Sequence, residues 1–463
     1  MAKLGFDFPT QPRKTFLHEL EENWYNPMIA KHLGRDVQGV KRSNFGEYNM
    51  AVNYTTSVLE EAVAIEKVAV YNIDHMAQIL FSGKDCPALL DRALGGAMSE
   101  MKIGTCKYTL LLNDKGGVQD DMILMRLNDH EYIMVINAGH DITDAIEHDG
   151  KKTELIADVD RVMMHKQTGE DVSARDISDT LVKVDIQGPL SFKLIKQIYG
   201  ADVLKNRNQP EKNMNFFSFN EFELDGHKYY ISRTGYTNRW GWELYIPVAK
   251  AEADFKAIVS SAVELGGLLV GLGGRDENRI SAGAYGLPLM GSDYDPDHSP
   301  VNAPLFDAAI DMNKAFFVGK AALEKELATH PSKKMMIFIS EGITSHRGIY
   351  LDDKRIGSVT SSINSPNLSL EKRLAIGSAR KNVNEPNGTA AIGIGWLYES
   401  PFEKDAEGND ITELGGLPIR IPVKFYREDS NHSPSGTSLL GYLTVEGISP
   451  ATAPKALKNI DNL

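Results

Sequence analysis

The sequence predicts an α+β fold whose C-terminal part is rich in β-strands. Apolar residues recur at helical spacing over 57–70, and two strand-like runs flank turn residues within 108–126. After about residue 330, short strand-like runs alternate with glycine, serine and proline turns, which is typical of a separate β domain. We therefore expect one folded region over residues 1–330 and a β-rich domain over residues 331–463.

Local patterns place the individual helices and strands. Residues 14–33 have mixed helical spacing and predict a surface helix. Thr56 or Ser57 can cap the helix 57–70, because a hydroxyl oxygen there accepts a free backbone N–H. Pro189 can open a helix, since a first-turn N–H has no helical partner to lose. The other expected elements are helices at 86–97, 249–265 and 275–285, strands near 76–82, 131–137, 182–186, 221–232 and 242–247, an insertion at 150–180 and a loop at 398–418.

The composition excludes several classes of protein. The net charge of −13 disfavours general binding to nucleic acid or to an anionic membrane, which both need a basic surface. The two cysteines, Cys86 and Cys106, form no metal-binding or disulfide pattern. The N-terminus lacks the apolar core of a signal peptide, and no apolar run reaches the roughly 18 residues that a membrane span needs. We expect a cytoplasmic protein without a metal site.

The hairpin Tyr108–Met122 carries two adjacent aspartates in its second strand. Side chains alternate along a strand, so Asp120 and Asp121 are expected on opposite faces and not in the same site. Both faces look apolar, which makes one carboxylate costly to bury. A plainer alternative is that one aspartate braces the turn while the other meets solvent.

A second segment, Ile231–Ile246, places aromatic residues and a glutamate between two strand signals. Glu243 shares a face with Gly241 and Tyr245, which suits a flat heterocycle with an amidine-like edge. One carboxylate can accept two parallel N–H bonds from such an edge. The alternative is a glutamate at a strand edge in water, with the aromatic residues packed behind it.

Arg275 and Arg279 are four residues apart near the start of a predicted helix, so they lie on one face. They could clamp an anionic group on an otherwise acidic protein, or they could pair with Asp276 and Glu277. His75 is a lone histidine beside an acid and is more often structural than catalytic. No hydrolase triad, dinucleotide fingerprint or metal-ligand spacing is present.

Taken together and in this order, five stretches resemble the T protein of the glycine cleavage system, a tetrahydrofolate-dependent aminomethyltransferase. The stretches are Asn44–Tyr54, Asn72–Met76, Tyr108–Met122, Ile231–Thr237 with Glu243, and Gly271–Asp276. A sixth, Val359–Pro366, is similar to the C-terminal domain of that family. The resemblance runs from about residue 42 to 395. It implies a three-domain cloverleaf with a central folate channel, two interleaved subdomains before residue 330 and a barrel-like domain after it.

The resemblance also implies roles for single residues. Asp121, rather than Asp120, becomes the catalytic carboxylate beside the reacting nitrogens of tetrahydrofolate. Glu243 becomes the anchor of the pterin ring. The remaining cofactor-binding residues that it implies are Tyr54, Met76, Tyr108, Asn137, Tyr236 and Arg275.

The chain departs from the family on the side of the one-carbon donor. Phe45–Tyr48 replaces the usual Phe-Ala-Gly-Trp, and Asp74 replaces the usual serine before His75. The chain is also longer, with an N-terminal extension and insertions near 150–180 and 398–435. Branches of this superfamily that show such a pattern are demethylases for sulfonium, amine or aryl ether donors. Glu47, Tyr48, Asp74 and His75 are therefore expected in the donor pocket, where the two acids would favour a cationic donor. The alternative is that either acid is simply solvated.

We thus expect a tetrahydrofolate-dependent one-carbon transferase. The leading hypothesis is a demethylase that moves a methyl group from a small donor to tetrahydrofolate, giving 5-methyltetrahydrofolate. The alternative is the aminomethyltransferase, which takes its group from a lipoyl carrier protein and gives 5,10-methylenetetrahydrofolate and ammonia. An alternative of another class is a folate-binding factor without transfer activity.

Overall fold

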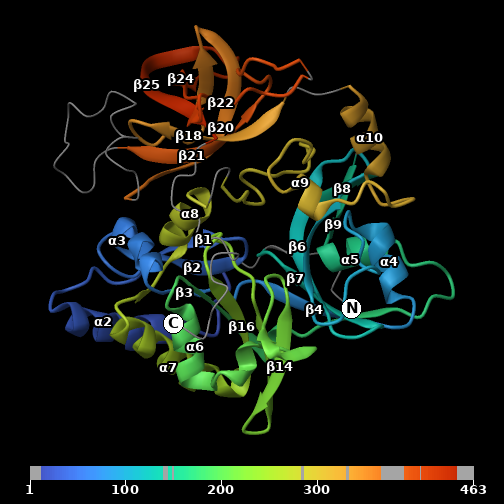
Figure 1. Cartoon of the computed structure of the whole chain (residues 1–463), viewed down its shortest axis with the longest axis vertical. Coiled ribbons are helices and arrows are strands. Elements are labelled where there is room, and N and C mark those ends of the chain that lie inside the picture. The colour runs from blue at the N-terminus through green and yellow to red at the C-terminus, as the bar shows by residue number, and fades with distance from the viewer. Residues whose placement is uncertain are drawn as a thin grey trace.

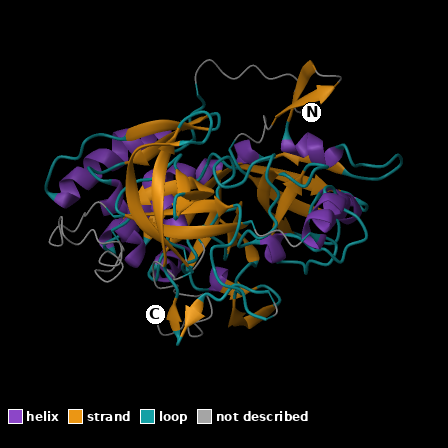
Figure 2. Cartoon of the chain, turned by 90° about the horizontal axis from the view of Figure 1, so that it is seen from above, coloured by secondary structure: helices purple, strands orange, loops and turns teal. Residues whose placement is uncertain are grey.

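The structure is a computed structural model of the chain. It describes residues 12–138, 144–148, 151–282, 286–329, 333–366, 390–406 and 408–445, with the backbone alone for 144–148 and 151–156. Figure 1 shows three lobes, with the red and orange C-terminal lobe above a blue-to-green lobe and a cyan lobe. Many of the helices lie toward the outer flanks of the strands (Figure 2).

The first lobe contains a six-stranded sheet. Its strand order is β14 (Phe219–Leu224), β15 (His227–Ser232), β16 (Gly241–Pro247), β11 (Leu181–Gln187), β3 (Ala69–Asn72) and β17 (Leu268–Leu269). The pairs are antiparallel except for β3 with β17. Helices α6 (Ser191–Tyr199) and α7 (Ala251–Glu264) pack their apolar faces on this sheet and enclose the largest core.

The cyan lobe contains a five-stranded antiparallel sheet. Its order is β10 (Ser173–Asp176), β4 (Ala77–Ser82), β7 (Glu131–Ile136), β6 (Val118–Arg126) and β5 (Cys106–Leu112). Helices α4 (Cys86–Ala93) and α5 (Asp158–Met163) cover one face of it and form a second core. The predicted hairpin is therefore β5 and β6. Its register shifts between Leu111 and Leu112, which pair with Asp120 and Val118, so Gln119 is an extra residue in a bulge.

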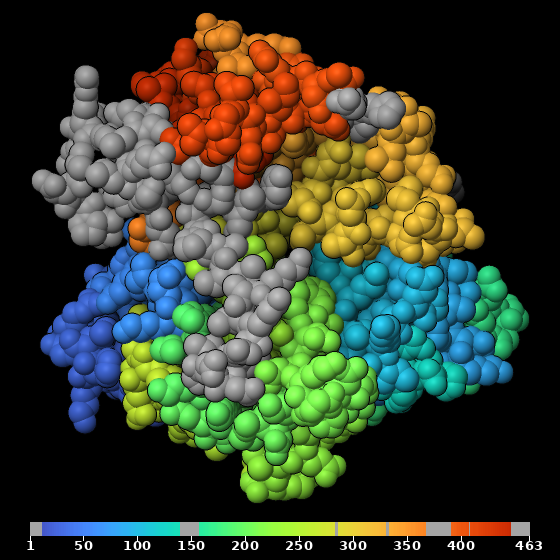
Figure 3. Space-filling model, in the orientation of Figure 1, coloured from blue at the N-terminus to red at the C-terminus, as the bar shows by residue number. Residues whose placement is uncertain are grey.

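The C-terminal lobe is a closed barrel, which confirms the predicted β-rich domain. The strands around it are β18 (Lys334–Ser340), β21 (Ala391–Leu397), β20 (Lys354–Asn364), β19 (Gly348–Leu351), β24 (Ile421–Glu428) and β25 (Pro434–Thr444). In Figure 3 the yellow residues near 300–330 lie between this barrel and the cyan lobe. Helices α9 (Phe306–Ala309) and α10 (Lys320–Ala328) belong to that segment. A domain boundary at residue 330 stays a prediction.

The N-terminal segment is helical, as predicted for residues 14–33, although its helices begin at His18. It consists of α1 (His18–Leu20), a π-turn η1 (Glu21–Tyr25) and α2 (Asn26–Leu33). Leu17, Tyr25 and Ile29 are fully buried against the six-stranded sheet. The segment therefore lies at the surface and buries one apolar face, which the polar residues between these three obscured in the sequence.

Two other expectations need correction. The predicted helix 57–70 is only α3 (Val58–Ala62) followed by a 3₁₀ turn η2 (Val63–Glu66), because Ala69 already pairs within the sheet. Ser57 caps it, with its Oγ accepting from the Leu59 N–H at 3.2 Å. Helix α8 (Leu272–Ile280) starts three residues before the predicted helix 275–285 and ends before residue 285. Residues 283–285 lie outside the described residues, and so do residues 1–11 of the N-terminal extension.

The segments expected to be irregular contain regular elements as well. The insertion at 150–180 includes β9 (Lys151–Ile156), α5 and β10, and the loop at 398–418 contains a small hairpin of β22 (Glu413–Leu414) with β23 (Leu417–Pro418). Within the described residues, no helix is long and apolar enough to cross a membrane. The remaining elements are β1 (Lys41–Phe45), β2 (Tyr48–Asn53), β8 (Asp144–His148), β9 (Lys151–Ile156), η3 (Ser178–Thr180), η4 (Asp202–Leu204), β12 (Lys205–Asn206), β13 (Gln209–Asn213), η5 (Val248–Lys250), β22 (Glu413–Leu414) and β23 (Leu417–Pro418).

Candidate functional site

A cavity of about 530 Å³ lies between the two sheets. Strands β5, β6 and β7 line it from one sheet, β16 lines it from the other, and α8 borders it. The predicted site residues that line it are Met76, His75, Tyr108, Asp121, Asn137, Tyr236, Glu243 and Arg275. Segments that are far apart in the sequence thus meet around one space. The roles of these residues stay predictions.

Asp121 lines the cavity, whereas Asp120 is buried behind it with only 2% of its surface exposed. The predicted opposite faces therefore hold, but the inference that the two acids serve separate sites needs correction. The amide of Asn137 donates to Asp121 Oδ1 at 2.7 Å and also to Asp120 Oδ1 at 2.9 Å. One side chain thus couples the two carboxylates.

The turn of the hairpin is braced by Asn113 rather than by an aspartate of the pair. Asn113 Oδ1 accepts from the N–H groups of Lys115 and Gly117 at 2.9 and 3.0 Å, and its amide donates to the carbonyl of Pro296 at 2.8 Å. The alternative in which Asp120 or Asp121 braces the turn is therefore wrong.

Burial raises the pKa of both aspartates. For Asp120 the pKa rises to about 7, first through loss of water and then through the charge of Asp121. For Asp121, burial also raises the pKa, but the nearby Tyr108, the amide of Asn137 and the charge of Arg275 favour its ionised form. Asp121 is therefore the member of the pair that keeps its negative charge, and this charge faces the cavity.

Glu243 is held inside the six-stranded sheet and not at a strand edge in water. Only 4% of it is exposed, and β16 lies between β15 and β11. Thr234 Oγ1 donates to Glu243 Oε2 at 2.6 Å, and Lys183 Nζ lies 3.3 Å from the same oxygen. A buried lysine and a hydroxyl therefore fix one carboxylate oxygen of a residue that lines the cavity.

The predicted arginine pair divides into two roles. Arg279 is fully engaged, since it contacts Asp293 Oδ2 at 2.7 Å, Asp276 Oδ1 at 2.6 Å and the Leu287 carbonyl at 2.8 Å. Arg275 instead lies over the ring of Tyr236 at 4.9 Å, and its buried Nε has no hydrogen-bond partner among the described residues. Of the two arginines, Arg275 is thus the one that is available to an anionic ligand.

A second, more polar hollow of about 310 Å³ adjoins the cavity and shares Phe45, Tyr236, Arg275 and Leu289 with it. The hydroxyls of β20 and Ser345 line its other side. Arg275 therefore stands between an enclosed space and a hydroxyl-lined opening toward the barrel.

His75 lines the cavity and is 2% exposed. Burial lowers its pKa well below the usual value, and the positive charges of Arg275 and Lys183 lower it further. Its Nδ1 has no hydrogen-bond partner in the described part of the chain, and Phe45 packs edge-on against the ring at 5.2 Å. His75 therefore presents a neutral imidazole.

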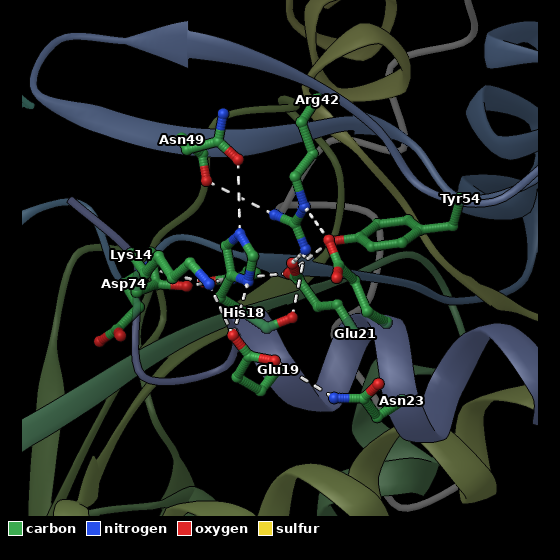
Figure 4. Close-up of polar contacts among 12 residues, drawn as sticks. Lys14, His18, Glu19, Glu21, Asn23, Arg42, Asn49, Tyr54 and Asp74 are labelled. Carbon is green, nitrogen blue, oxygen red and sulfur yellow. Dashed lines mark hydrogen bonds and ion pairs between the residues drawn. The ribbon is translucent and has the colours of Figure 1, made fainter. Parts of the chain in front are cut away.

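The other residues predicted to line the folate channel or donor pocket lie outside the cavity. The hydroxyl of Tyr54 donates to Glu21 at 2.6 Å, within a polar cluster that includes the 2.8 Å pair of Glu21 with Arg42 (Figure 4). Asp74 accepts from the backbone N–H of Phe16 at 2.9 Å.

Glu47 and Tyr48 pair through their backbones with the N-terminal segment. The backbone N–H of Arg13 donates to the Glu47 carbonyl at 2.7 Å, and Arg13 forms an isolated parallel β-bridge with Tyr48. The three residues that differ from the family pattern, Glu47, Tyr48 and Asp74, therefore contact the N-terminal segment around residues 13–16. They give no support to a pocket for a cationic donor.

One group of described residues has the geometry to approach a metal ion, namely His18, Glu19 and Glu22, whose ligand atoms lie within 4.8 Å of one another. Lys14 already pairs with Glu19 at 2.7 Å, and Arg42 pairs with Glu22 at 2.8 Å. The two carboxylates are thus neutralised by side chains, as Figure 4 shows for Lys14 and Glu19.

Sequence reasoning missed several residues that line the cavity. Phe216, Phe217 and Leu305 line it, and the adjacent pair of phenylalanines in a polar stretch was the available signal. It also missed Lys183, which is buried beside Glu243 and was detectable as a charge within the predicted strand 182–186.

Comparison with known proteins agrees with the resemblance. A family model described as "GCVT N-terminal domain" matches residues 35–314. An aminomethyltransferase of Cutibacterium acnes is 31% identical over 345 residues, which are 74% of this chain and 87% of that protein. An aminomethyltransferase of Listeria monocytogenes is 29% identical over 362 residues, 77% of this chain and 90% of the relative.

The fold is also similar to that of a solved structure, the glycine cleavage system aminomethyltransferase T from Bartonella henselae. The TM-score is 0.65 at 22% identity, and the match covers 93% of this chain and 96% of the other. This likeness confirms the predicted fold class.

Proposed function

This chain belongs to the GCVT family and is a tetrahydrofolate-dependent transferase, and we propose that the group it transfers is an aminomethyl group. The observation that supports the proposal at the site is the cavity in which Asp121, Glu243 and Arg275 meet. The demethylase was the leading hypothesis from the sequence, but the names of the relatives favour its alternative.

The chemistry of the cavity fits tetrahydrofolate. Glu243, which is fixed by Thr234 and Lys183, would accept the N–H groups of the pterin edge. Arg275, with its unpartnered Nε, would bind the anionic tail. Met76, Tyr108 and the other predicted cofactor-binding residues of the cavity would line the space between. Tetrahydrofolate supplies the nitrogen that receives the one-carbon unit.

The residues of the chain would act mainly through charge and position. Asp121 would stabilise the positive charge that develops next to it during transfer, because a fixed carboxylate in a partly dry site interacts more strongly than one in water. Asn137 orients this carboxylate. The neutral His75 adds a polar ring without adding a second positive charge.

An aminomethyl donor requires a carrier. We propose that the donor is attached to a lipoyl carrier protein and that ammonia leaves as the second product. A cytoplasmic location stays a prediction. The third hypothesis, a folate-binding factor without activity, is disfavoured because the relatives are named as enzymes.

Demethylation remains a second candidate because of one observation. Phe45, Phe216, Phe217 and Leu305 give part of the cavity an apolar wall that suits a small aromatic methyl ether. Glu47 and Asp74 lie outside the cavity, so their charges give no preference for a cationic donor.

The product separates the two candidates. The purified protein is incubated with tetrahydrofolate and either an aminomethylated lipoyl carrier protein or a panel of aryl methyl ethers, and the folate products are separated by mass spectrometry. Formation of 5,10-methylenetetrahydrofolate and ammonia from the carrier supports the proposal. Formation of 5-methyltetrahydrofolate from an ether alone contradicts it and supports demethylation.

A further inference from the structure

A buried ion pair connects helix α8 to the C-terminal barrel. Arg279, which lies one turn after Arg275 on α8, is 2% exposed, and Asp293 is 1% exposed. One nitrogen of the Arg279 guanidinium donates to Asp293 Oδ2 at 2.7 Å, and another donates to the hydroxyl of Ser361 on β20 at 2.7 Å. The helix that carries Arg275 is therefore bonded directly to a strand of the barrel.

Two neighbouring hydroxyls of β20 reach the same oxygen of Asp293. Thr360 Oγ1 donates to Asp293 Oδ1, and Ser361 Oγ donates to it at 2.8 Å. Adjacent residues of a regular strand point to opposite faces. The register of β20 against β21 shifts between Val359 and Ser361, however, so Thr360 is an extra residue in a bulge. This bulge lets both hydroxyls face Asp293.

The same ion pair holds a short segment of the cavity wall. Leu287 and Leu289 both line the cavity. Arg279 donates to the carbonyl of Leu287 at 2.8 Å, and Asp293 Oδ2 accepts from the backbone N–H of Leu289 at 2.9 Å. The segment is therefore anchored on both sides of the residue between these two leucines.

Tyr236 connects this segment to Arg275. The hydroxyl of Tyr236 donates to the carbonyl of Pro288, which lies between the two anchored leucines. The guanidinium of Arg275 lies over the Tyr236 ring, 4.9 Å from its centre. A guanidinium is attracted to the negative face of an aromatic ring, so a shift of the ring also shifts the preferred position of the guanidinium. A continuous chain of contacts thus runs from the barrel to Arg275.

Stability alone does not account for this network, because a buried ion pair often stabilises a protein no more than apolar side chains of the same size. We propose that Arg279 and Asp293 are positioning residues that hold Tyr236 and thereby keep Arg275 where the cavity meets the hydroxyl-lined hollow. The contacts with the barrel would then set the affinity for the anionic tail of tetrahydrofolate. The inference rests on the proposed function, because it takes Arg275 as the residue that binds this tail.

A positioning network and a merely structural network have different consequences for binding. If the network only stabilises the fold, its loss should weaken the binding of every ligand of the cavity alike. If it positions Arg275, its loss should weaken only those ligands that carry the anionic tail. The loss should also have no further effect once Arg275 itself has been removed, because the two residues then act through one contact.

The test is titration calorimetry of Asp293→Asn with tetrahydrofolate and with a reduced pterin that lacks the glutamate tail. Asparagine keeps the shape of the side chain but removes the charge that holds Arg279 and replaces one accepting oxygen with a donor. The dissociation constant for tetrahydrofolate should rise by about three- to tenfold, because a displaced guanidinium loses part of a charge-assisted contact whose full loss amounts to about tenfold or more. The dissociation constant for the pterin should not change.

A double variant and a second single variant complete the experiment. Arg275→Met combined with Asp293→Asn should bind tetrahydrofolate no more weakly than Arg275→Met alone. If Asp293→Asn does not fold, Ser361→Ala decides, since it removes the hydroxyl that contacts both members of the ion pair and should give the same selective loss. Its matched control is Ser340→Ala, which removes another buried hydroxyl of the barrel, one that donates to the Gly342 carbonyl at 2.8 Å. This control should bind both ligands like the wild type.

A loss confined to tetrahydrofolate, and absent from the Arg275→Met background, supports the inference. Equal losses for the two ligands overturn it, and so does an unchanged affinity for tetrahydrofolate or a further loss in the double variant. Two other results would instead contradict the proposed function, and the inference would fall with it. They are a wild-type protein that does not bind tetrahydrofolate and an Arg275→Met variant that loses affinity equally for both ligands.

Discussion

Asp121→Asn should slow one-carbon transfer while leaving the fold intact. The asparagine has the same shape, and its carbonyl oxygen can still accept from Asn137, whose amide lies 2.7 Å from Asp121 Oδ1. A hydrogen bond of this kind contributes about 1 kcal/mol, so the free energy of unfolding should change by no more than about that. The variant therefore removes a charge and little else.

The size of the effect follows from the electrostatics of the cavity. A unit charge about 4 Å from a carboxylate interacts with it by about 4 kcal/mol at an effective dielectric constant near 20. Asp121 is half-buried, so water screens part of this interaction, and about 2–4 kcal/mol remains. At about 1.4 kcal/mol for each factor of ten, turnover should fall by roughly 30- to 1,000-fold.

The assay is single-turnover transfer from an aminomethylated lipoyl carrier protein to tetrahydrofolate, with the product measured by mass spectrometry. Asp120→Asn is the matched control, because Asp120 accepts from the same amide but lies behind the cavity wall. Its rate should stay within about tenfold of wild type. The reasoning fails if the two variants are slowed equally, or if Asp120→Asn is the slower enzyme.

Three further predictions concern stability and binding. Because burial raises the pKa of Asp120 to about 7, its protonated form stabilises the folded protein fully below the unfolded pKa near 4, and this stabilisation is lost as the pH rises through 7. Asp120→Asn should therefore flatten the fall in thermal stability between pH 5 and pH 8. An equally steep fall in the variant would contradict this prediction. Arg42→Met leaves the buried Glu21 carboxylate without its 2.8 Å partner and should lower the free energy of unfolding by about 3–5 kcal/mol, measured with denaturant. Lys14→Met breaks an exposed pair and should lower it by no more than about 1 kcal/mol. Equal losses of stability in the two variants would refute the distinction between buried and exposed pairs. Arg275→Met should weaken binding of tetrahydrofolate by about tenfold or more but not that of a pterin without the glutamate tail, measured by titration calorimetry, and an equal loss for both ligands would argue against a tail contact.

Local chemistry made the hairpin predictable from the sequence. Its turn residues and its alternating strand residues act over a few positions, and these placed Asp121 on a different face from Asp120. The bulge at Gln119 comes from a shift in the register of β6 against β5, which alternation alone does not reveal, and the shared contact with Asn137 comes from the end of β7. They were therefore not visible in the hairpin alone.

Long-range contacts account for most of the errors. Asp74 was assigned to a donor pocket because it replaces the usual serine before His75, yet its carboxylate accepts from the backbone N–H of Phe16, which is 58 residues away. The helix predicted over 57–70 ended early because Ala69 joins the middle of a sheet formed by distant strands. The spacing of apolar residues indicates which face of an element is buried, but it does not indicate which distant segment covers that face.

The most direct test of the account is the affinity of the Glu243→Gln variant for tetrahydrofolate. The amide keeps the size of the side chain but replaces one of the two accepting oxygens with a donor, so it cannot accept two N–H bonds from the pterin edge. A charge-assisted hydrogen bond contributes about 1.5–3 kcal/mol, which predicts a dissociation constant raised by roughly 10- to 150-fold. An unchanged dissociation constant, in a variant that unfolds like the wild type, would mean that the folate ring does not bind at Glu243.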